Sequence, residues 1–296
     1  MSLPIPVFIV HWNRPQECIR TVQCFLEQNL LVSISVIDNA SSQENVKILS
    51  ENLPANVKLV RLEENKGWGG GLNVLLSQWL VNKKEPYCFI SAHDALPQGK
   101  CLNMLINSLE SDSKLGIVCP EYGNPELPRF SPIKGPHFIF TTPRPTGTVE
   151  SIPFPHGTLM AFRWECLKDI GLFDERYFAY GDEYDLGLRT WLYNWKVAIV
   201  WGALVVNPGS WTPSPIKTYL FTRNSLLLAY TYGGRLQAML RIFLICINTS
   251  RLLIFPFTRK NAFFTDDFLY ARFLAITNFI LNRHGCPPSQ LSKLKL

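Results

Sequence analysis

Short apolar runs alternate with segments of helical periodicity as far as residue 119, and this alternation restricts the fold more than any other feature. The apolar runs of strand length are residues 6–10, 33–37, 57–61, 87–91 and 115–119. The segments with helical spacing between them are residues 14–28, 44–51, 72–81 and 99–110. Because a helix between two strands carries the chain back across the sheet, such strands pair in parallel. The sequence therefore predicts an α/β fold with a mostly parallel sheet and helices on both faces.

The order of the elements changes after residue 121. Residues 122–155 are rich in proline and glycine, and we interpret them as a functional loop or a small insertion. The predicted elements that follow are a strand at 157–162, helices at 164–170 and 182–193, and a strand at 196–201. We assign residues 1–234 to this α/β domain.

The remaining segment, residues 235–296, differs in character. Leu236, Leu240 and Ile247 belong to a helical pattern of apolar side chains with arginines between them. No apolar run reaches 18 residues, so a membrane-spanning helix is disfavoured. Two interpretations stay open: helices that lie on a membrane surface, and helices that pack on the main domain or on a second subunit.

Composition excludes several classes of protein. With 47% hydrophobic and 18% charged residues, the chain is too apolar for long disordered stretches. The net charge of +6 suits an anionic ligand or membrane surface, but no dense basic run with aromatics is present, so we expect no nucleic acid. The eight cysteines form no C-x-x-C pair and predict reduced thiols in a cytoplasmic protein. The N-terminus does not read as a signal peptide.

Three acids, Asp182, Glu183 and Asp185, follow a glycine and two aromatic residues and begin a helical pattern. Carboxylates this close repel one another, so one of them can hold its proton more tightly and act as a general base. The alternative is an acidic first turn of a helix, stabilised by the macrodipole and by an i,i+4 pair between Asp185 and Arg189.

Other candidates lie beyond predicted strands, where ligands bind in parallel sheets. Asp38 can accept hydrogen bonds from a base or ribose, or cap the next turn. Asp94 can hold Mg²⁺ or Mn²⁺ against a diphosphate, or belong to a turn. Arg223 can clamp a phosphate, or be an ordinary surface arginine. The glycine-rich segment 65–71 predicts a loop whose backbone approaches an anionic ligand, with a flexible turn as the alternative.

Five segments, in this order, resemble the family 2 glycosyltransferases with the GT-A fold, especially the rhamnosyltransferase-like branch. They are Val7–Asn13, Val36–Ser42, Glu64–Asn73, His93–Pro97 and Gly171–Arg189. The likeness runs from about residue 6 to residue 224, with a looser match in the C-terminal helices. It implies the GT-A fold, a Rossmann-like mostly parallel sheet flanked by helices. It also implies transfer of a sugar from a nucleotide diphosphate to an acceptor hydroxyl, usually with inversion.

The resemblance also implies roles for single residues. It places Asp38 on the nucleobase, and it places Glu183 at the position of the catalytic base with Asp182 as its rival and Asp185 beside them. The residues that we expect around the donor are His11, Asn13, Asp38, Asn65, Lys66, Gly70, His93, Asp94 and Arg223. The residues that we expect around the acceptor are Tyr177, Phe178, Tyr180 and Gly181.

Two departures from the family pattern concern the metal. Asp94 falls where the family has its metal-binding aspartate, but Ala92 and His93 replace the usual acidic neighbours. Asn207 stands where the family often has a histidine ligand. We therefore expect weak dependence on Mg²⁺ or Mn²⁺, or else Lys66, Arg223 and His93 supplying part of the positive charge.

Together these features predict an enzyme of surface polysaccharide synthesis. Its donor would be dTDP-rhamnose or a UDP- or GDP-sugar, and its acceptor a glycan or lipid-linked hydroxyl. We expect it in the cytoplasm, at the inner face of the cytoplasmic membrane where its C-terminal helices bind lipid. Two alternatives stay open: a degenerate relative that binds sugars or scaffolds an assembly, and a nucleotidyltransferase.

Overall fold

The computed structural model describes residues 3–82, 85–121, 124–207, 212, 214–254 and 266–293. The chain folds as two compact units. The first unit consists of residues 1–129, 138–174 and 183–209, and the second of residues 130–137, 175–182 and 210–296.

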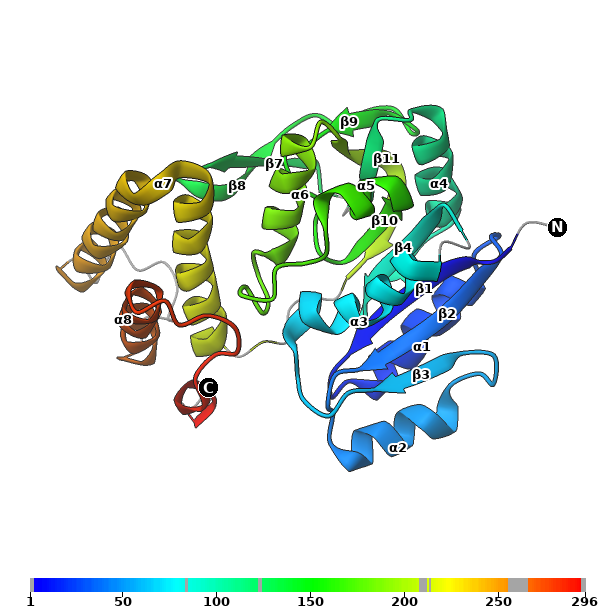
Figure 1. Cartoon of the computed structure of the whole chain (residues 1–296), viewed down its shortest axis with the longest axis horizontal. Coiled ribbons are helices and arrows are strands. Elements are labelled where there is room, and N and C mark those ends of the chain that lie inside the picture. Colours follow the sequence, from blue (N-terminus) through cyan, green and yellow to red (C-terminus); the bar gives the residue numbers. More distant parts are fainter. Residues whose placement is uncertain are drawn as a thin grey trace. The chain divides into compact units, whose positions relative to one another are not determined.

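Within the described residues, the first unit is built on a nine-stranded sheet (Figure 1). Its order is β3-β2-β1-β4-β10-β6-β11-β5, and β9 pairs with β11 beside this path. The strands are β1 (Ile5–His11), β2 (Val32–Asp38), β3 (Lys58–Arg61), β4 (Tyr87–Ala92), β5 (Leu96–Pro97), β6 (Leu115–Glu121), β9 (Val149–Ser151), β10 (Leu159–Arg163) and β11 (Lys196–Val206). A separate pair, β7 (Glu126–Ser131) and β8 (Gly135–Phe140), forms a hairpin whose turn belongs to the second unit.

The sheet is mixed but mostly parallel, as predicted. Strands β1, β2, β3 and β4 pair in parallel, and β6 pairs in parallel with β11, while β10 runs antiparallel between β4 and β6. His11 lies opposite Asp38, and Val10 opposite Ala92. The carboxyl ends of β1, β2 and β4 therefore open at one edge of the sheet.

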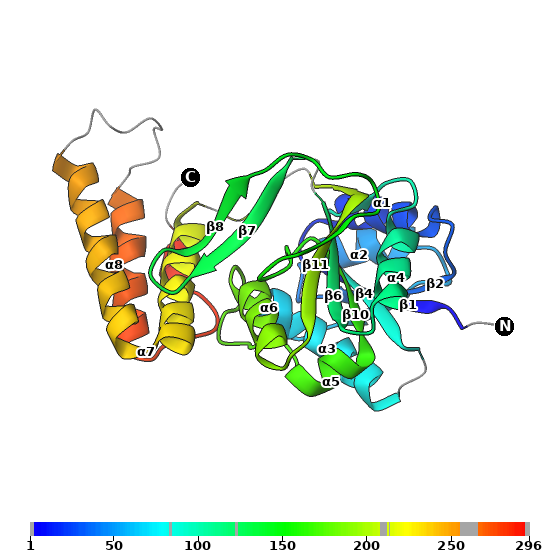
Figure 2. The same cartoon turned by 90° about the horizontal axis from the view of Figure 1, so that it is seen from above.

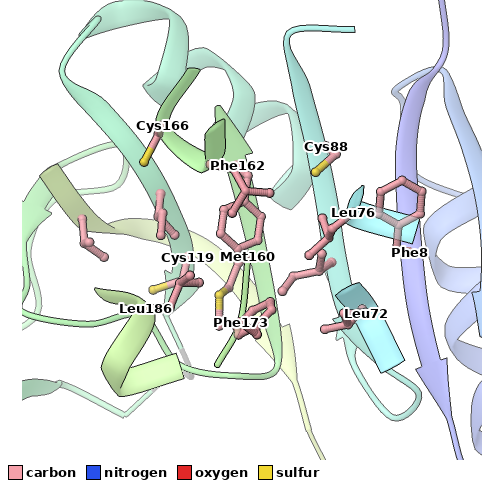
Figure 3. Close-up of a cluster of buried hydrophobic side chains, with 14 of the residues drawn as sticks. Phe8, Leu72, Leu76, Cys88, Cys119, Met160, Phe162, Cys166, Phe173 and Leu186 are labelled. Atoms are coloured by element: carbon pink, nitrogen blue, oxygen red, sulfur yellow. The ribbon is translucent and has the colours of Figure 1, made fainter. Parts of the chain in front are cut away.

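Helices cover both faces of this sheet because its strands alternate apolar side chains between the two sides. On one face, Phe8 and Val10 pack with α3 (Gly67–Asn82), α5 (Trp164–Ile170) and α6 (Asp182–Leu192). Figure 3 shows this cluster, which includes Leu72 of α3, Phe162 of β10 and Leu186 of α6. On the other face, the neighbouring residues Val7 and Ile9 pack with α1 (Pro15–Leu26), α2 (Gln43–Asn52) and α4 (Cys101–Ser111).

The structure differs from the predicted local structure in two segments. The glycine-rich segment is not a loop up to residue 71, since α3 starts at Gly67. A Cβ on Gly71 would come within 3.0 Å of Val10 Cγ2, so this glycine allows α3 to approach β1 closely. Residues 122–155 contain β7, β8 and β9, whose weak alternation of apolar and polar residues did not mark them as strands.

The second unit is mainly helical. It contains α7 (Ser214–Ile254), α8 (Asp266–Ile280) and a short 3-10 helix (Ser289–Lys293), and Figure 2 shows α8 beside α7. Gly234, where we expected the first domain to end, lies inside α7 and interrupts the helical dihedrals with φ 79° and ψ −177°. Among the described residues, no helix combines the length and apolar character that crossing a bilayer requires.

Candidate active site

The loops after β1 and β2 are joined by a buried pair. The Nδ1 atom of His11 donates to Asp38 Oδ1 at 3.0 Å, and the ring's Nε2 accepts the backbone N–H of Arg14, so hydrogen bonding assigns the neutral tautomer. Burial opposes ionisation of Asp38, but the hydrogen bonds from His11 and Ser41 outweigh it and hold the pKa below its usual range. The carboxylate of Asp38 is fully buried, and its hydrogen bonds with His11 and Ser41 hold the loops after β1 and β2 together.

Asn13 strengthens this link between the loops. Its backbone has φ 53°, its N–H donates to Ser41 Oγ, and its side-chain oxygen accepts from the N–H of Ser42. Trp12, between His11 and Asn13, is 48% exposed. An exposed indole on a loop this well tied is suited to stacking on a planar ligand. Sequence reasoning named both of its neighbours and missed Trp12.

The start of α3 is held against the same loops by Asn39. Its side-chain oxygen accepts the N–H of Lys66 at 2.9 Å, and its amide donates to Asn65 Oδ1 and to the carbonyl of Gly67. Asn65 in turn accepts the N–H of Gly67 and so caps the helix. Gly70 lies buried in the first turn of α3, and the side chain of Lys66 is exposed. The expected donor residues 65, 66 and 70 thus lie beside the nucleotide loop predicted around Asp38.

Asp94 lies beyond β4 and meets the end of β11. The amide of Asn207 donates to Asp94 Oδ1 and to Thr158 Oγ1, both at 3.3 Å. Burial raises the pKa of Asp94, and the nearby charge of Glu17 adds to this effect. Asn207 therefore contacts the aspartate at which the metal is expected, although it is separated from it by 113 residues.

His93 does not supply the positive charge that we expected of it. Burial lowers the pKa of His93 to about 4, so its ring is neutral at pH 7. The ring meets that of His11 edge to face, with centroids 5.9 Å apart. His93 therefore packs against His11 at the end of β1.

Glu183, on the first turn of α6, is half-buried and faces the segment before β10. A Cβ built on Gly157 would lie 3.8 Å from the carboxyl carbon of Glu183 and 3.9 Å from the ring of Trp68. Gly157 is followed by Thr158, which contacts Asn207 and, through it, Asp94. Within the first unit, the predicted base, the glycine-rich helix start and the predicted metal ligand therefore converge on residues 157–158.

Asp185 has a structural partner. Its Oδ2 atom accepts from Arg189 Nε at 2.7 Å, and the same guanidinium donates to the carbonyls of Ile170 and Leu172. The i,i+4 pair was the alternative weighed for this acid, and it ties α6 to the end of α5. Asp182 is buried at the start of α6 and belongs to the second unit.

Arg223 also lies in the second unit, where it is fully buried. Its guanidinium donates to the carbonyls of Arg176, Tyr177 and Gly285. These hydrogen bonds hold the backbone of the second unit, and they do not support the predicted role of Arg223 as a phosphate clamp. Asn224, which sequence reasoning passed over, donates to the carbonyls of Tyr177, Ala179 and Tyr180.

The expected acceptor residues form one turn of this second unit. Phe178 and Tyr180 both have positive φ, 67° and 62°, and Gly181 has φ 139°. Tyr177 is fully buried, while the Tyr180 hydroxyl donates to Thr212 Oγ1. A Cβ on Gly181 would come within 3.0 Å of the Tyr177 ring, so a glycine is required there. Acceptor binding by these residues stays a prediction.

Comparison with known proteins gives the family. Residues 7–171 match the model of "Glycosyl transferase family 2", more than half of the chain. A search of curated proteins found no match.

Several solved structures share the fold. A structure of GalNAc-T7 with UDP, GalNAc and Mn²⁺ matches with a TM-score of 0.60 and 18% identity over 75% of this chain and 47% of that one. TarS of S. aureus matches with a TM-score of 0.55 and 14% identity over 98% and 50%. The chain thus spans about half the length of these two proteins.

The mannosyltransferase PcManGT of Pyrobaculum calidifontis, solved with GDP-Man and Mn²⁺, matches with a TM-score of 0.56 and 14% identity. The match covers 96% of this chain and 87% of that one. These structural matches establish the GT-A fold. The family match, which spans β1 to the end of α5, establishes membership of the family. The chain belongs to glycosyl transferase family 2, the class of transferase that its sequence predicts.

Proposed function

We propose that this protein transfers a sugar from a nucleotide diphosphate to an acceptor hydroxyl, with Glu183 as the general base. The observation that carries the proposal is the convergence of Glu183, Trp68 and Asp94 on residues 157–158. A carboxylate positioned there reaches the same edge of the sheet as the expected donor residues.

The proposed reaction is a single in-line displacement that inverts the anomeric centre. Glu183 takes the proton of the acceptor hydroxyl while that oxygen attacks the anomeric carbon and the bond to the diphosphate breaks. A positioned base contributes about 10²–10⁴-fold to the rate. Trp68 approaches the same glycine as Glu183, Gly157, and its ring would exclude water from one side of the carboxylate.

The donor would lie along the edge formed by β1, β2 and the start of α3. We propose that Trp12 stacks on the nucleobase and that Lys66, exposed beside that edge, faces the diphosphate. Asp38 and His11 would act by fixing the loop that carries Trp12, because their polar atoms are engaged with each other and with neighbouring residues.

A divalent cation fits the donor atoms near Asp94. The described residues contain no cluster of three or more His, Cys, Asp and Glu side chains suited to a metal. The amide nitrogen of Asn207 donates to both Asp94 and Thr158, so a carboxylate and a hydroxyl oxygen lie beside this amide. With the amide turned so that its own oxygen faces them, the three side chains would offer the oxygen ligands that hard cations such as Mg²⁺ prefer. When bound, the cation would neutralise charge on the departing diphosphate. Two of the similar structures, those of GalNAc-T7 and PcManGT, were solved with Mn²⁺.

The finer expectations form part of the same proposal. The donor would be dTDP-rhamnose or a UDP- or GDP-sugar, and the acceptor a growing surface glycan or a lipid-linked sugar. The protein would work in the cytoplasm, at the inner face of the cytoplasmic membrane. Family membership favours this reaction over nucleotidyl transfer.

A catalytically degenerate relative that binds sugars is the second candidate. It is favoured by the lack, among the described residues, of a cluster of three or more His, Cys, Asp and Glu side chains, and by the neutral ring of His93 next to Asp94 in the sequence. Such a protein would bind the nucleotide sugar without releasing nucleoside diphosphate.

A donor panel distinguishes the candidates. UDP-, GDP- and dTDP-sugars are each tested with and without Mg²⁺ or Mn²⁺, and both thermal shift and nucleotide release are measured. Transfer predicts one donor that raises the melting temperature and yields nucleoside diphosphate. A shift without release would indicate the degenerate relative, release of pyrophosphate would indicate nucleotidyl transfer, and no shift with any donor would contradict donor binding.

A further inference from the structure

The second half of α7, residues 235–254, turns its apolar side outward. Large apolar side chains recur there at intervals of three and four residues, which places them along one side of the helix. These residues, which we call the α7 stripe, are Leu236, Met239, Leu240, Phe243, Leu244, Ile247 and Ile254. Each is at least 40% exposed, and Leu236 reaches 79%. A helix of a water-soluble unit usually points such a stripe toward the core.

The less exposed side of the same helix, which includes Ala238 and Arg241, faces the rest of the second unit. Arg241 donates to the carbonyl of Ile133 in the hairpin turn, at 2.8 Å. Arg272 of α8 donates to Asn248 Oδ1 and to Thr249 Oγ1. Polar contacts therefore fix the helix to its own unit, and the α7 stripe stays exposed within that unit.

Charge distinguishes between the surfaces that could cover this stripe. Residues 210–296 contain eleven lysines and arginines and only two acids, although the whole chain carries a net charge of only +6. Arg235 and Arg251, at either end of the stripe, are exposed. Two copies meeting here would bring like charges together, whereas an anionic surface is attracted to them.

We propose that the α7 stripe lies in the headgroup region of an anionic bilayer, with Arg235 and Arg251 against lipid phosphates. An interfacial helix of this kind has an apolar side of Leu, Ile and Phe and basic residues at its borders. The α8 helix adds Phe273, which is 69% exposed, to the apolar surface of the same unit. This surface requires no donor and no turnover, so it stands apart from the proposed activity.

Flotation with lipid vesicles tests the proposal on the full chain. Vesicles of phosphatidylcholine alone are compared with vesicles that also contain phosphatidylglycerol. The wild type should float with the anionic vesicles, and high salt should weaken this binding. Leu236→Glu combined with Phe243→Glu should weaken binding by about tenfold or more. Each change removes an apolar side chain that the bilayer would bury and introduces a negative charge that the anionic lipids repel.

Val81→Glu is the matched control, since Val81 is 84% exposed at the end of α3 in the first unit. It should bind vesicles as the wild type does, and melting temperatures should show that both variants are folded. No binding of the wild type to anionic vesicles would overturn the proposal, as would equal binding of the double variant. A dimer that the double variant disperses, without any vesicle binding, would show that a second copy covers the stripe instead.

Discussion

Substitution of Gly187 tests most directly how α6 packs against the segment that contains Pro153 and Phe154. A Cβ at this position would lie 2.4 Å from Phe154 Cα, 2.6 Å from Phe154 Cβ and 2.9 Å from the carbonyl oxygen of Pro153. Two of these atoms are backbone and cannot turn aside. Gly187 and Glu183 are four residues apart and so lie on one side of α6, where Glu183 faces Gly157 of the same segment.

Gly187→Ala should therefore push α6 away from residues 153–157. Ordinary carbon contacts begin near 3.4 Å, so the helix or the segment has to move by about 1 Å. Overpacking of this kind costs about 1–3 kcal/mol of folding free energy. Under the proposed mechanism Glu183 moves with the helix, and a displacement of about 1 Å lowers the rate by as much as about 10²-fold.

The companion variant is Gly157→Ala, at the other end of the same contact. Its methyl group would meet Glu183 and Trp68 only at ordinary van der Waals distances, so stability should stay close to that of the wild type. Urea denaturation measures both variants, and nucleotide release with the donor from the panel measures the rate. Wild-type stability of Gly187→Ala, or equal destabilisation by the two changes, would refute the packing that we describe for α6.

Three further predictions use buried polar groups. His11→Ala removes the hydrogen bond to the buried Asp38 carboxylate and should cost about 3 kcal/mol in urea denaturation; an unchanged midpoint would contradict the role of the pair. Because burial raises the pKa of Asp94 in the folded state, its ionisation opposes folding as the pH rises through that pKa. Asp94→Asn should therefore be more stable than the wild type at pH 7 but slower in transfer, and lower stability at pH 7 would be the contrary result. Arg223→Lys cannot reach the carbonyls that the guanidinium fork binds and should cost about 3 kcal/mol, whereas a tolerant site would show wild-type melting.

The parallel strands of the sheet were predictable because the sequence pattern identifies them. The apolar runs in β1, β2, β4 and β6 are short and are separated by amphipathic segments, so both their number and their parallel order follow from the pattern. The position of Asp38 and Asp94 at one edge followed in turn, since parallel strands end on the same side.

The start of α3 was not predictable in the same way. Glycines favour turns in isolation, and the start of α3 is held by hydrogen bonds from outside it. Asn65 accepts the N–H of Gly67, and Asn39, beyond β2, donates to the carbonyl of Gly67. No local sequence pattern indicates that the Asn39 side chain reaches this helix.

The roles of single charged residues depended even more on distant parts of the chain. Arg223 looked like a surface arginine or a phosphate clamp, but its partners are carbonyls at 176, 177 and 285. His93 looked like a source of positive charge, but its burial beside His11 keeps it neutral. Burial is a property of the folded chain, so charge at these positions could not be inferred from residue type.

The central claim is that Glu183 removes the acceptor proton, and the Glu183→Gln variant tests it most directly. Glutamine keeps the shape of the side chain but cannot act as a base. With the donor identified by the panel, transfer should fall by about 10²–10⁴-fold while the donor's thermal shift stays as in the wild type. Glu44→Gln, on α2, serves as control and should change neither quantity. Near-normal transfer by Glu183→Gln with intact donor binding would contradict the account.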